Sequence, residues 1–178
     1  ALQLRWFDHY LKGIKNGVDT EPALDLFIMG DNVWRQEHEW PLARTVWTAF
    51  YLRKGGVLDT VAPGSEAADE YRYDPGNPTP DLVDARELEL NINEDYQAVH
   101  AQRTDLLTYT TAPLKKDTEI TGPMTATLWA ATDARDTDWN LMILDVYPDG
   151  RPLRIQDGVA RARFRNGFDR PSLLTPGK

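Results

Sequence analysis

The two serines of the chain, Ser65 and Ser172, are the first candidates for a hydrolytic nucleophile. Ser65 lies in the sequence Pro-Gly-Ser-Glu and Ser172 in Pro-Ser-Leu. The nucleophile of an α/β-hydrolase lies in the pattern G-x-S-x-G, a strained turn between a strand and a helix that exposes the hydroxyl group. Neither serine has this pattern. Both are therefore predicted to be loop residues, and no catalytic triad is expected within the chain.

Three histidines, His9, His38 and His100, are candidates for general bases or metal ligands. Metal sites need two or three ligands at short, fixed spacing. None of these histidines has another histidine two, three or four positions away, and the chain has no cysteine that could supply a thiolate. We interpret them as surface or hydrogen-bonding residues, and we expect neither a metal site nor a cofactor.

Acidic residues are the most frequent charged groups. The pairs Asp136/Asp138 and Asp145/Asp149 have the chemistry for acid–base catalysis, but turn capping explains them better because no pocket is indicated around them. Residues 69–95 hold nine acids and two arginines. This segment lacks the D-x-D-x-D-G pattern of a calcium loop, so it is predicted to be a solvated loop with an edge strand.

Six tryptophans could form a platform that stacks against sugars, or they could fill a core. At least four of them, Trp6, Trp47, Trp129 and Trp139, occur in periodic apolar segments. Large aromatic side chains in such segments usually pack inside a domain, so we expect mainly core packing.

Composition narrows the class of protein and its partners. The 178 residues are 41% hydrophobic, which is typical of a globular chain long enough for one domain. The net charge of −8 and the absence of a basic run argue against binding to nucleic acid or to an anionic membrane surface. No window of 18 apolar residues is present that could span a membrane. The absence of cysteine fits a reducing compartment.

The elements that would position these residues begin with a helix. Leu2, Trp6 and Tyr10 recur at every fourth position, which predicts a helix over residues 2–12 with Gly13 as its C-cap. Apolar runs separated by turn residues then predict strands at residues 24–30, 46–52, 71–73, 106–111, 124–132, 139–147 and 159–164. Many strands without a second strong helix favour a mainly β sandwich over a βαβ fold.

Short motifs along nearly the whole chain resemble cocaine-esterase-like and X-Pro dipeptidyl-peptidase-like serine hydrolases, and they occur in the order of that family. The motifs are Arg5-Trp6-Phe7-Asp8 with Leu11-Lys12-Gly13, Phe27-Ile28-Met29-Gly30 with Trp34-Arg35 and Glu39-Trp40-Pro41, Tyr71-Arg72-Tyr73-Asp74-Pro75, Arg103-x-Asp105-Leu106-Leu107, Ile120-Thr121-Gly122-Pro123, Asp136-Thr137-Asp138, Asp145-Val146-Tyr147-Pro148-Asp149-Gly150 and Asp157-Gly158-Val159-x-Arg161-x-Arg163.

The resemblance implies a parent protein with an α/β-hydrolase domain, a helical cap and a C-terminal jelly roll. The triad of such a parent would precede the counterpart of Ala1, so this chain is expected to be a non-catalytic part. Residues 1–22 would be the tail of the hydrolase domain and a linker, and residues 23–178 the jelly-roll β-sandwich. The implied partner is the α/β-hydrolase domain of the same polypeptide.

The resemblance also implies that the jelly roll closes one side of the acyl pocket. We expect the segment 81–102 to face the cleft, with Leu88 and Leu90 as substrate-pocket residues, because their spacing of two places both on one side of an extended segment. Relatives often carry a Gly-Gly element here that this chain lacks. The choice between ester, X-Pro peptide and acyl amide substrates therefore stays open.

An alternative is a free-standing jelly roll that binds carbohydrate or protein. The helix over residues 2–12 favours the accessory-domain interpretation, because its broad apolar face needs a neighbour to cover it. The chain begins without Met in the middle of this pattern, and relatives continue past the counterpart of Lys178. We therefore expect a piece of a longer polypeptide that, made alone, self-associates or is held by a partner.

Overall fold

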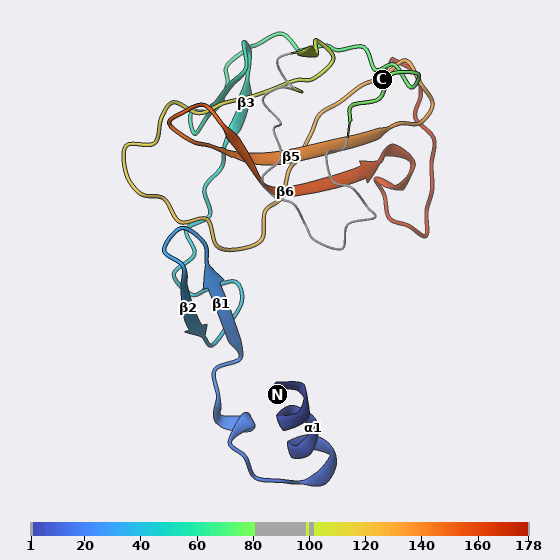
Figure 1. Ribbon diagram of the computed structural model, residues 1–178. Coiled ribbons are helices and arrows are strands. Elements are labelled where there is room, and N and C mark those ends of the chain that lie inside the picture. The colour runs from blue at the N-terminus through green and yellow to red at the C-terminus, as the bar shows by residue number, and fades with distance from the viewer. Residues whose placement is uncertain (1, 81–98, 100–101, 178) are drawn as a thin grey trace. The chain divides into compact units, whose positions relative to one another are not determined.

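The computed structural model describes residues 2–80, 99 and 102–177, and these residues are mainly β where they have regular structure. Three sheets, each of two antiparallel strands, account for the strands in the described ranges (Figure 1). The elements, in chain order, are α1 (Leu2–Lys12), the 3-10 helix η1 (Val18–Thr20), β1 (Leu24–Ile28), β2 (Val33–Glu37), β3 (Tyr51–Arg53), β4 (Val57–Asp59), β5 (Asp138–Val146), β6 (Pro152–Arg161) and the 3-10 helix η2 (Ala162–Phe164). The chain divides into two compact units: unit 1 is Ala1–Ala49 with Pro113–Ala126, and unit 2 is Phe50–Ala112 with Thr127–Lys178.

In unit 1, helix α1 has the predicted bounds and ends at the predicted cap. Gly13 has a φ of 69°, a left-handed conformation that glycine adopts without steric cost. Its N–H donates to the carbonyl of His9 at 3.0 Å, and the N–H of Ile14 donates to the carbonyl of Asp8 at 3.1 Å. Carbonyls in the last turn that have no partner within the helix are thereby satisfied.

The hairpin β1–β2 also belongs to unit 1. Its register pairs Phe27 with Trp34, and the two rings lie 5.4 Å apart between centroids. Successive side chains of a strand alternate between the two faces of a sheet. Phe27 and Trp34 are exposed on one face, whereas Ile28 on the other face is buried. The hairpin therefore has one inner face and one outer aromatic face.

In unit 2, the short hairpin β3–β4 is connected by a turn that requires glycine. Gly56 has a φ of 79°, and a Cβ at this position would lie 2.8 Å from the carbonyl oxygen of Thr108. The close approach exists because Thr110 bonds to the hairpin. Its N–H donates to the carbonyl of Gly56 at 2.8 Å, and its own carbonyl accepts from the N–H of Leu58 at 3.0 Å.

The long hairpin β5–β6 is the largest element of unit 2 and is drawn as two adjacent arrows in Figure 1. The two strands run from the Asp138–Arg161 pair to the Val146–Pro152 pair, with an irregularity between Ile143 and Leu144. The turn uses Gly150 at a φ of 86°, and its N–H donates to the carbonyl of Tyr147 at 2.8 Å. This is the turn that the Pro-Asp-Gly sequence predicts.

The predicted strands are confirmed where a local turn sets the pairing and are wrong elsewhere. Strands are present at the predicted runs 24–30 and 139–147. Of the run 46–52 only the end is paired, in β3, and β6 ends at Arg161 where η2 begins. The runs 71–73, 106–111 and 124–132 form no strand, although Thr110 makes an isolated bridge to Val57. Strand propensity reflects packing and pairing with neighbours, and apart from the Thr110 bridge these runs pair with no strand among the described residues.

Few apolar side chains are buried. The buried hydrophobic residues in the described ranges are Ile28, Leu42 and Ala162. The expectation of core packing is wrong for three of the four tryptophans in apolar segments, because Trp129 is 93% exposed and Trp6 and Trp47 are also exposed, whereas Trp139 is half-buried. The reason is geometric: sheets of two strands cover little of each other's surface, and stable sheets need more strands or a packed layer.

We predict from this exposure that the chain made alone self-associates or aggregates. Extended apolar surface and unpaired strand edges both promote association with another chain. The outer face of β1–β2, with Phe27 and Trp34, and the exposed Val159 of β6 supply such surface. Light scattering at low micromolar concentration checks this, and assemblies larger than a monomer are expected. A single monomeric species with a sharp, reversible thermal transition would contradict it.

Candidate domain interface

The serines and histidines do not form a catalytic arrangement in the described parts of the chain. Ser65 is an exposed loop residue, and the hydroxyl of Ser172 accepts a hydrogen bond from the amide of Asn166 at 3.3 Å. His9 uses its Nδ1 on the carbonyl of Ile14 at 3.0 Å, and His38 is exposed. His100 lies outside the described residues. Neither described serine therefore has a histidine that could remove its proton.

Turn capping is confirmed for Asp149, whereas Asp136 and Asp138 instead bind arginines. Asp149 caps the β5–β6 turn by accepting a hydrogen bond from the N–H of Arg151 at 3.0 Å. Asp138 binds Arg161 across the hairpin through two contacts of 2.7 and 2.8 Å, and these hydrogen bonds lower the pKa of Asp138. Asp145 lies within β5, opposite Leu153 of β6.

Asp136 joins the start of β5 to the segment that follows β6. It accepts the N–H of Arg163 at 3.0 Å and the guanidinium Nε of the same residue at 2.5 Å. Burial raises the pKa of Asp136, but the bonds from Arg163 outweigh this effect and the pKa is lowered. A carboxyl group held ionised in this way is a poor general acid. Asp136 therefore acts as a structural group.

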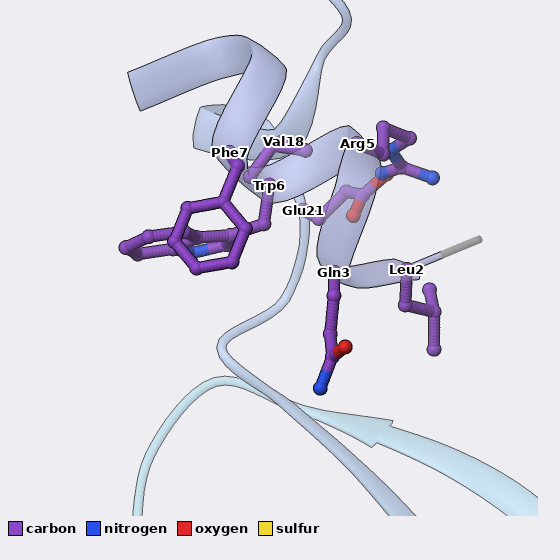
Figure 2. A pocket seen from close by; sticks show the side chains of 7 residues that line it. All are labelled: Leu2, Gln3, Arg5, Trp6, Phe7, Val18 and Glu21. Atoms are coloured by element: carbon purple, nitrogen blue, oxygen red, sulfur yellow. The ribbon is translucent and has the colours of Figure 1, made fainter. Parts of the chain in front are cut away.

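An apolar pocket that could receive a partner lies beside α1. Its volume is about 360 Å³, and its lining residues are Leu2, Gln3, Arg5, Trp6, Phe7, Val18 and Glu21. Figure 2 shows the rings of Trp6 and Phe7 side by side, with Arg5 and Glu21 facing each other elsewhere on the rim. Helix α1 and the turn at η1 together form the walls.

Aromatic contacts order this pocket. The ring centroids of Trp6 and Phe7 lie 5.3 Å apart at an interplanar angle of 89°, and those of Trp6 and Tyr10 lie 4.4 Å apart. Edge-to-face and tilted arrangements at these distances are favourable for aromatic pairs. Trp6 and Phe7 are nevertheless each 49% exposed. The cluster is thus ordered within the helix and open to a partner on its outer side.

Polar contacts hold the turn at η1, which forms the other wall of the pocket, against helix α1. Arg5 forms an ion pair with Glu21, and the side-chain amide of Asn16 donates to the carbonyl of Arg5 at 2.7 Å. The carbonyl oxygen of Asn16's own side chain accepts from the N–H of Val18. Because these contacts fix the turn that carries Val18 and Glu21, the pocket is formed before a partner arrives.

Of the two walls of this pocket, the sequence indicated helix α1 but not the turn at η1. The periodicity of α1 indicated an apolar face that needs covering, and the structure confirms that no residue of this helix is buried. The wall formed by Val18 and Glu21 depends on the contacts of Asn16 with Arg5, 11 positions earlier, and no pattern in the sequence signals such a contact. The predicted pocket residues Leu88 and Leu90 lie outside the described residues.

No group of three or more His, Asp or Glu side chains in the described ranges is arranged to hold a metal ion. No helix among these residues has the length and apolar character needed to cross a membrane.

Comparison with known proteins identifies the relatives. Residues 16–178 match the family described as the X-Pro dipeptidyl-peptidase C-terminal non-catalytic domain. The cocaine esterase of Rhodococcus sp. (strain MB1 Bresler) is 36% identical over 184 residues, which cover 97% of this chain and 32% of the esterase. This chain therefore spans about a third of the length of that relative.

Two solved structures share the fold. An aminopeptidase from a marine sediment Thaumarchaeota archaeon aligns with a TM-score of 0.82 and 28% identity, over 99% of this chain and 31% of the aminopeptidase. An α-amino acid ester hydrolase aligns with a TM-score of 0.75 and 26% identity, over 98% of this chain and 32% of the hydrolase. In each case the matching region is a minor part of a longer chain.

Proposed function

Since this chain belongs to the family of the X-Pro dipeptidyl-peptidase C-terminal non-catalytic domain, we propose that it is the accessory domain of a serine hydrolase that cleaves ester or peptide bonds. It packs on the catalytic α/β-hydrolase domain of the same polypeptide and shapes the substrate pocket. Support comes from relatives about three times as long, and from serines and histidines that are not arranged as a triad in the described ranges.

The proposed architecture has two parts. Residues 1–22, with α1 and η1, are the tail of the catalytic domain and a linker, and residues 23–178 form a jelly-roll β-sandwich. The antiparallel pairing of all three described sheets is compatible with such a sandwich. Its remaining core would come from layers that face one another in the assembled protein.

The observation that carries the packing proposal is the open aromatic face of α1. An 11-residue helix is marginal in water by itself, because most helical stability in proteins comes from packing of an apolar face. Here Leu2, Trp6, Phe7 and Tyr10 are all exposed. The rest of the catalytic domain, to which α1 is assigned, would cover them and supply the missing packing energy, and the pocket of Figure 2 would receive one of its apolar side chains.

The segment 81–102 is proposed to supply part of the pocket wall through Leu88 and Leu90. In the full-length enzyme, Leu88→Ala and Leu90→Ala are expected to change the ratio of kcat/KM between short and long acyl chains by about 10-fold, because each removed methylene contact contributes about 1–3 kcal/mol to discrimination. The thermal transition should shift little, since the effect acts on bound substrate. Kinetics on a series of nitrophenyl esters measure the ratio.

Leu107→Ala is a matched control for this experiment, because Leu107 is an exposed leucine in the next described segment of the same unit. It should leave the ratio of specificity constants unchanged. If the ratio for Leu88→Ala and Leu90→Ala is also unchanged, the segment does not form part of the substrate pocket.

A further inference from the structure

Four charged side chains of unit 1 form a continuous chain of alternating sign. Arg44 donates to Glu37 at 3.0 Å, and the Nε of Arg35 lies 2.8 Å from the same carboxylate. Arg35 also donates two hydrogen bonds to Glu119, at 3.0 and 2.5 Å. A bidentate contact between arginine and a carboxylate is the strongest geometry available to an ion pair. Glu119 and Arg35 are 84 positions apart.

The segment Pro113–Ala126, here called the strap, is the second stretch of unit 1. Among the described residues, no backbone–backbone hydrogen bond connects the strap to residues 2–49. Three of its apolar side chains, Leu114, Ile120 and Met124, are exposed. Gly122 approaches Thr45 closely enough that a Cβ would lie 3.9 Å from the methyl group of Thr45. Apolar burial and strand pairing therefore contribute little to its attachment.

We propose that the Arg35–Glu119 pair is a clasp that holds the strap on strand β2, in place of the hydrogen bonds of a third strand. Arg35 is the central group, since it contacts Glu119 on the strap and Glu37 on its own strand. Glu37 is in turn held by Arg44 and has a side chain only 13% exposed. Glu37 therefore lies at the Nε side of the Arg35 guanidinium, and the two terminal nitrogens of Arg35 bind Glu119 on the strap.

The strength of the Arg35–Glu119 attraction should depend more on salt concentration than on pH. Hydrogen bonds from Arg35 and Thr121 lower the pKa of Glu119 from 4.5 to about 2. Because the pKa of Glu119 is lowered on binding, the attraction is complete above pH 4.5 and is lost only as the pH falls towards 2. The side chains of Arg35 and Glu119 are 30% and 42% exposed, so dissolved salt can screen them.

Limited proteolysis of the full-length protein tests the clasp. Lys115 and Lys116 are exposed trypsin sites in the strap, and Arg72 is an exposed reference site in unit 2. In Glu119→Gln and in Arg35→Gln, cleavage at the two lysines is expected to rise about fivefold relative to cleavage at Arg72, the upper size for an exposed ion pair. The double variant should be no faster than Arg35→Gln alone, because that change already breaks the pair that Glu119→Gln removes.

Glu66→Gln is the control, since it breaks an ion pair of the same type, with Arg53, inside unit 2. Cleavage at Lys115 and Lys116 should not respond to it. In the unmodified protein, added sodium chloride should accelerate cleavage in the strap, whereas in the double variant it should not. Unchanged cleavage in either single variant, additive effects in the double variant, or an equal rise at Arg72 would each overturn the proposal.

Discussion

The chain produced alone is expected to hydrolyse nitrophenyl acetate no faster than buffer does. The proposed function predicts that the full-length protein accelerates this hydrolysis by about 10⁶-fold or more, as enzymes do. The nucleophile of a serine hydrolase needs a base within hydrogen-bonding distance and donors for the oxyanion. Ser172 is bonded to Asn166, and Ser65 lies in an exposed loop. Neither arrangement activates a hydroxyl group.

Two controls make the result specific. A serine-directed phosphonate should inactivate the full-length protein and should leave no covalent adduct on the chain produced alone, as read by intact mass. Ser65→Ala and Ser172→Ala in the full-length protein should retain activity. Phosphonate-sensitive turnover by the chain alone, lost in one of these two variants, would show that the chain carries a nucleophile.

In the full-length protein, Trp6→Ala is expected to lower the free energy of unfolding by about 3–5 kcal/mol, the usual cost of truncating a large aromatic side chain that is enclosed by packing. The ring of Trp6 contacts those of Phe7 and Tyr10 and is open on its outer side. If the rest of the catalytic domain closes that side, the substitution leaves a cavity where α1 packs on that domain. Urea denaturation followed by circular dichroism measures the change.

Lys12→Ala is the matched control on the same helix. Lys12 is exposed and pairs with Asp8 one turn earlier, a contact of 2.6 Å on the polar face. Its loss should cost less than about 0.5 kcal/mol, as for other exposed helix pairs. A similar, small effect for both variants would mean that the apolar face of α1 stays uncovered in the full-length protein.

Local patterns accounted for the parts of the fold that the sequence could predict. The helix over residues 2–12 and its glycine cap depend on neighbours within four positions, so both were predicted with correct bounds. The β5–β6 turn was equally accessible, because Pro148, Asp149 and Gly150 carry its signal. The polar sequence of β2, which includes Arg35 and Glu37, concealed a strand that forms because β1 lies beside it.

Contacts between distant segments were beyond such patterns. Residues 124–132 have strand-forming composition without an adjacent strand in the structure, since pairing depends on the rest of the chain and not on the residues themselves. The contact of Arg35 with Glu119 likewise forms only because the chain comes back to strand β2 after 84 positions. Charged residues are so common in this chain that neither member of this pair could be selected in advance.

Unit 1 is built from two stretches that are far apart in the sequence, residues 1–49 and 113–126. This separation has a consequence for synthesis on the ribosome. Hairpin β1–β2 and Arg35 leave the exit tunnel well before the strap, because 84 positions separate Arg35 from Glu119. At translation rates of about 5–20 residues per second, the wait is roughly 4 to 17 seconds. During that interval Arg35 lacks its partner on the strap. A nascent chain stalled before residue 119 therefore presents the guanidinium of Arg35 without Glu119, whereas one stalled a few tens of residues later can form the pair.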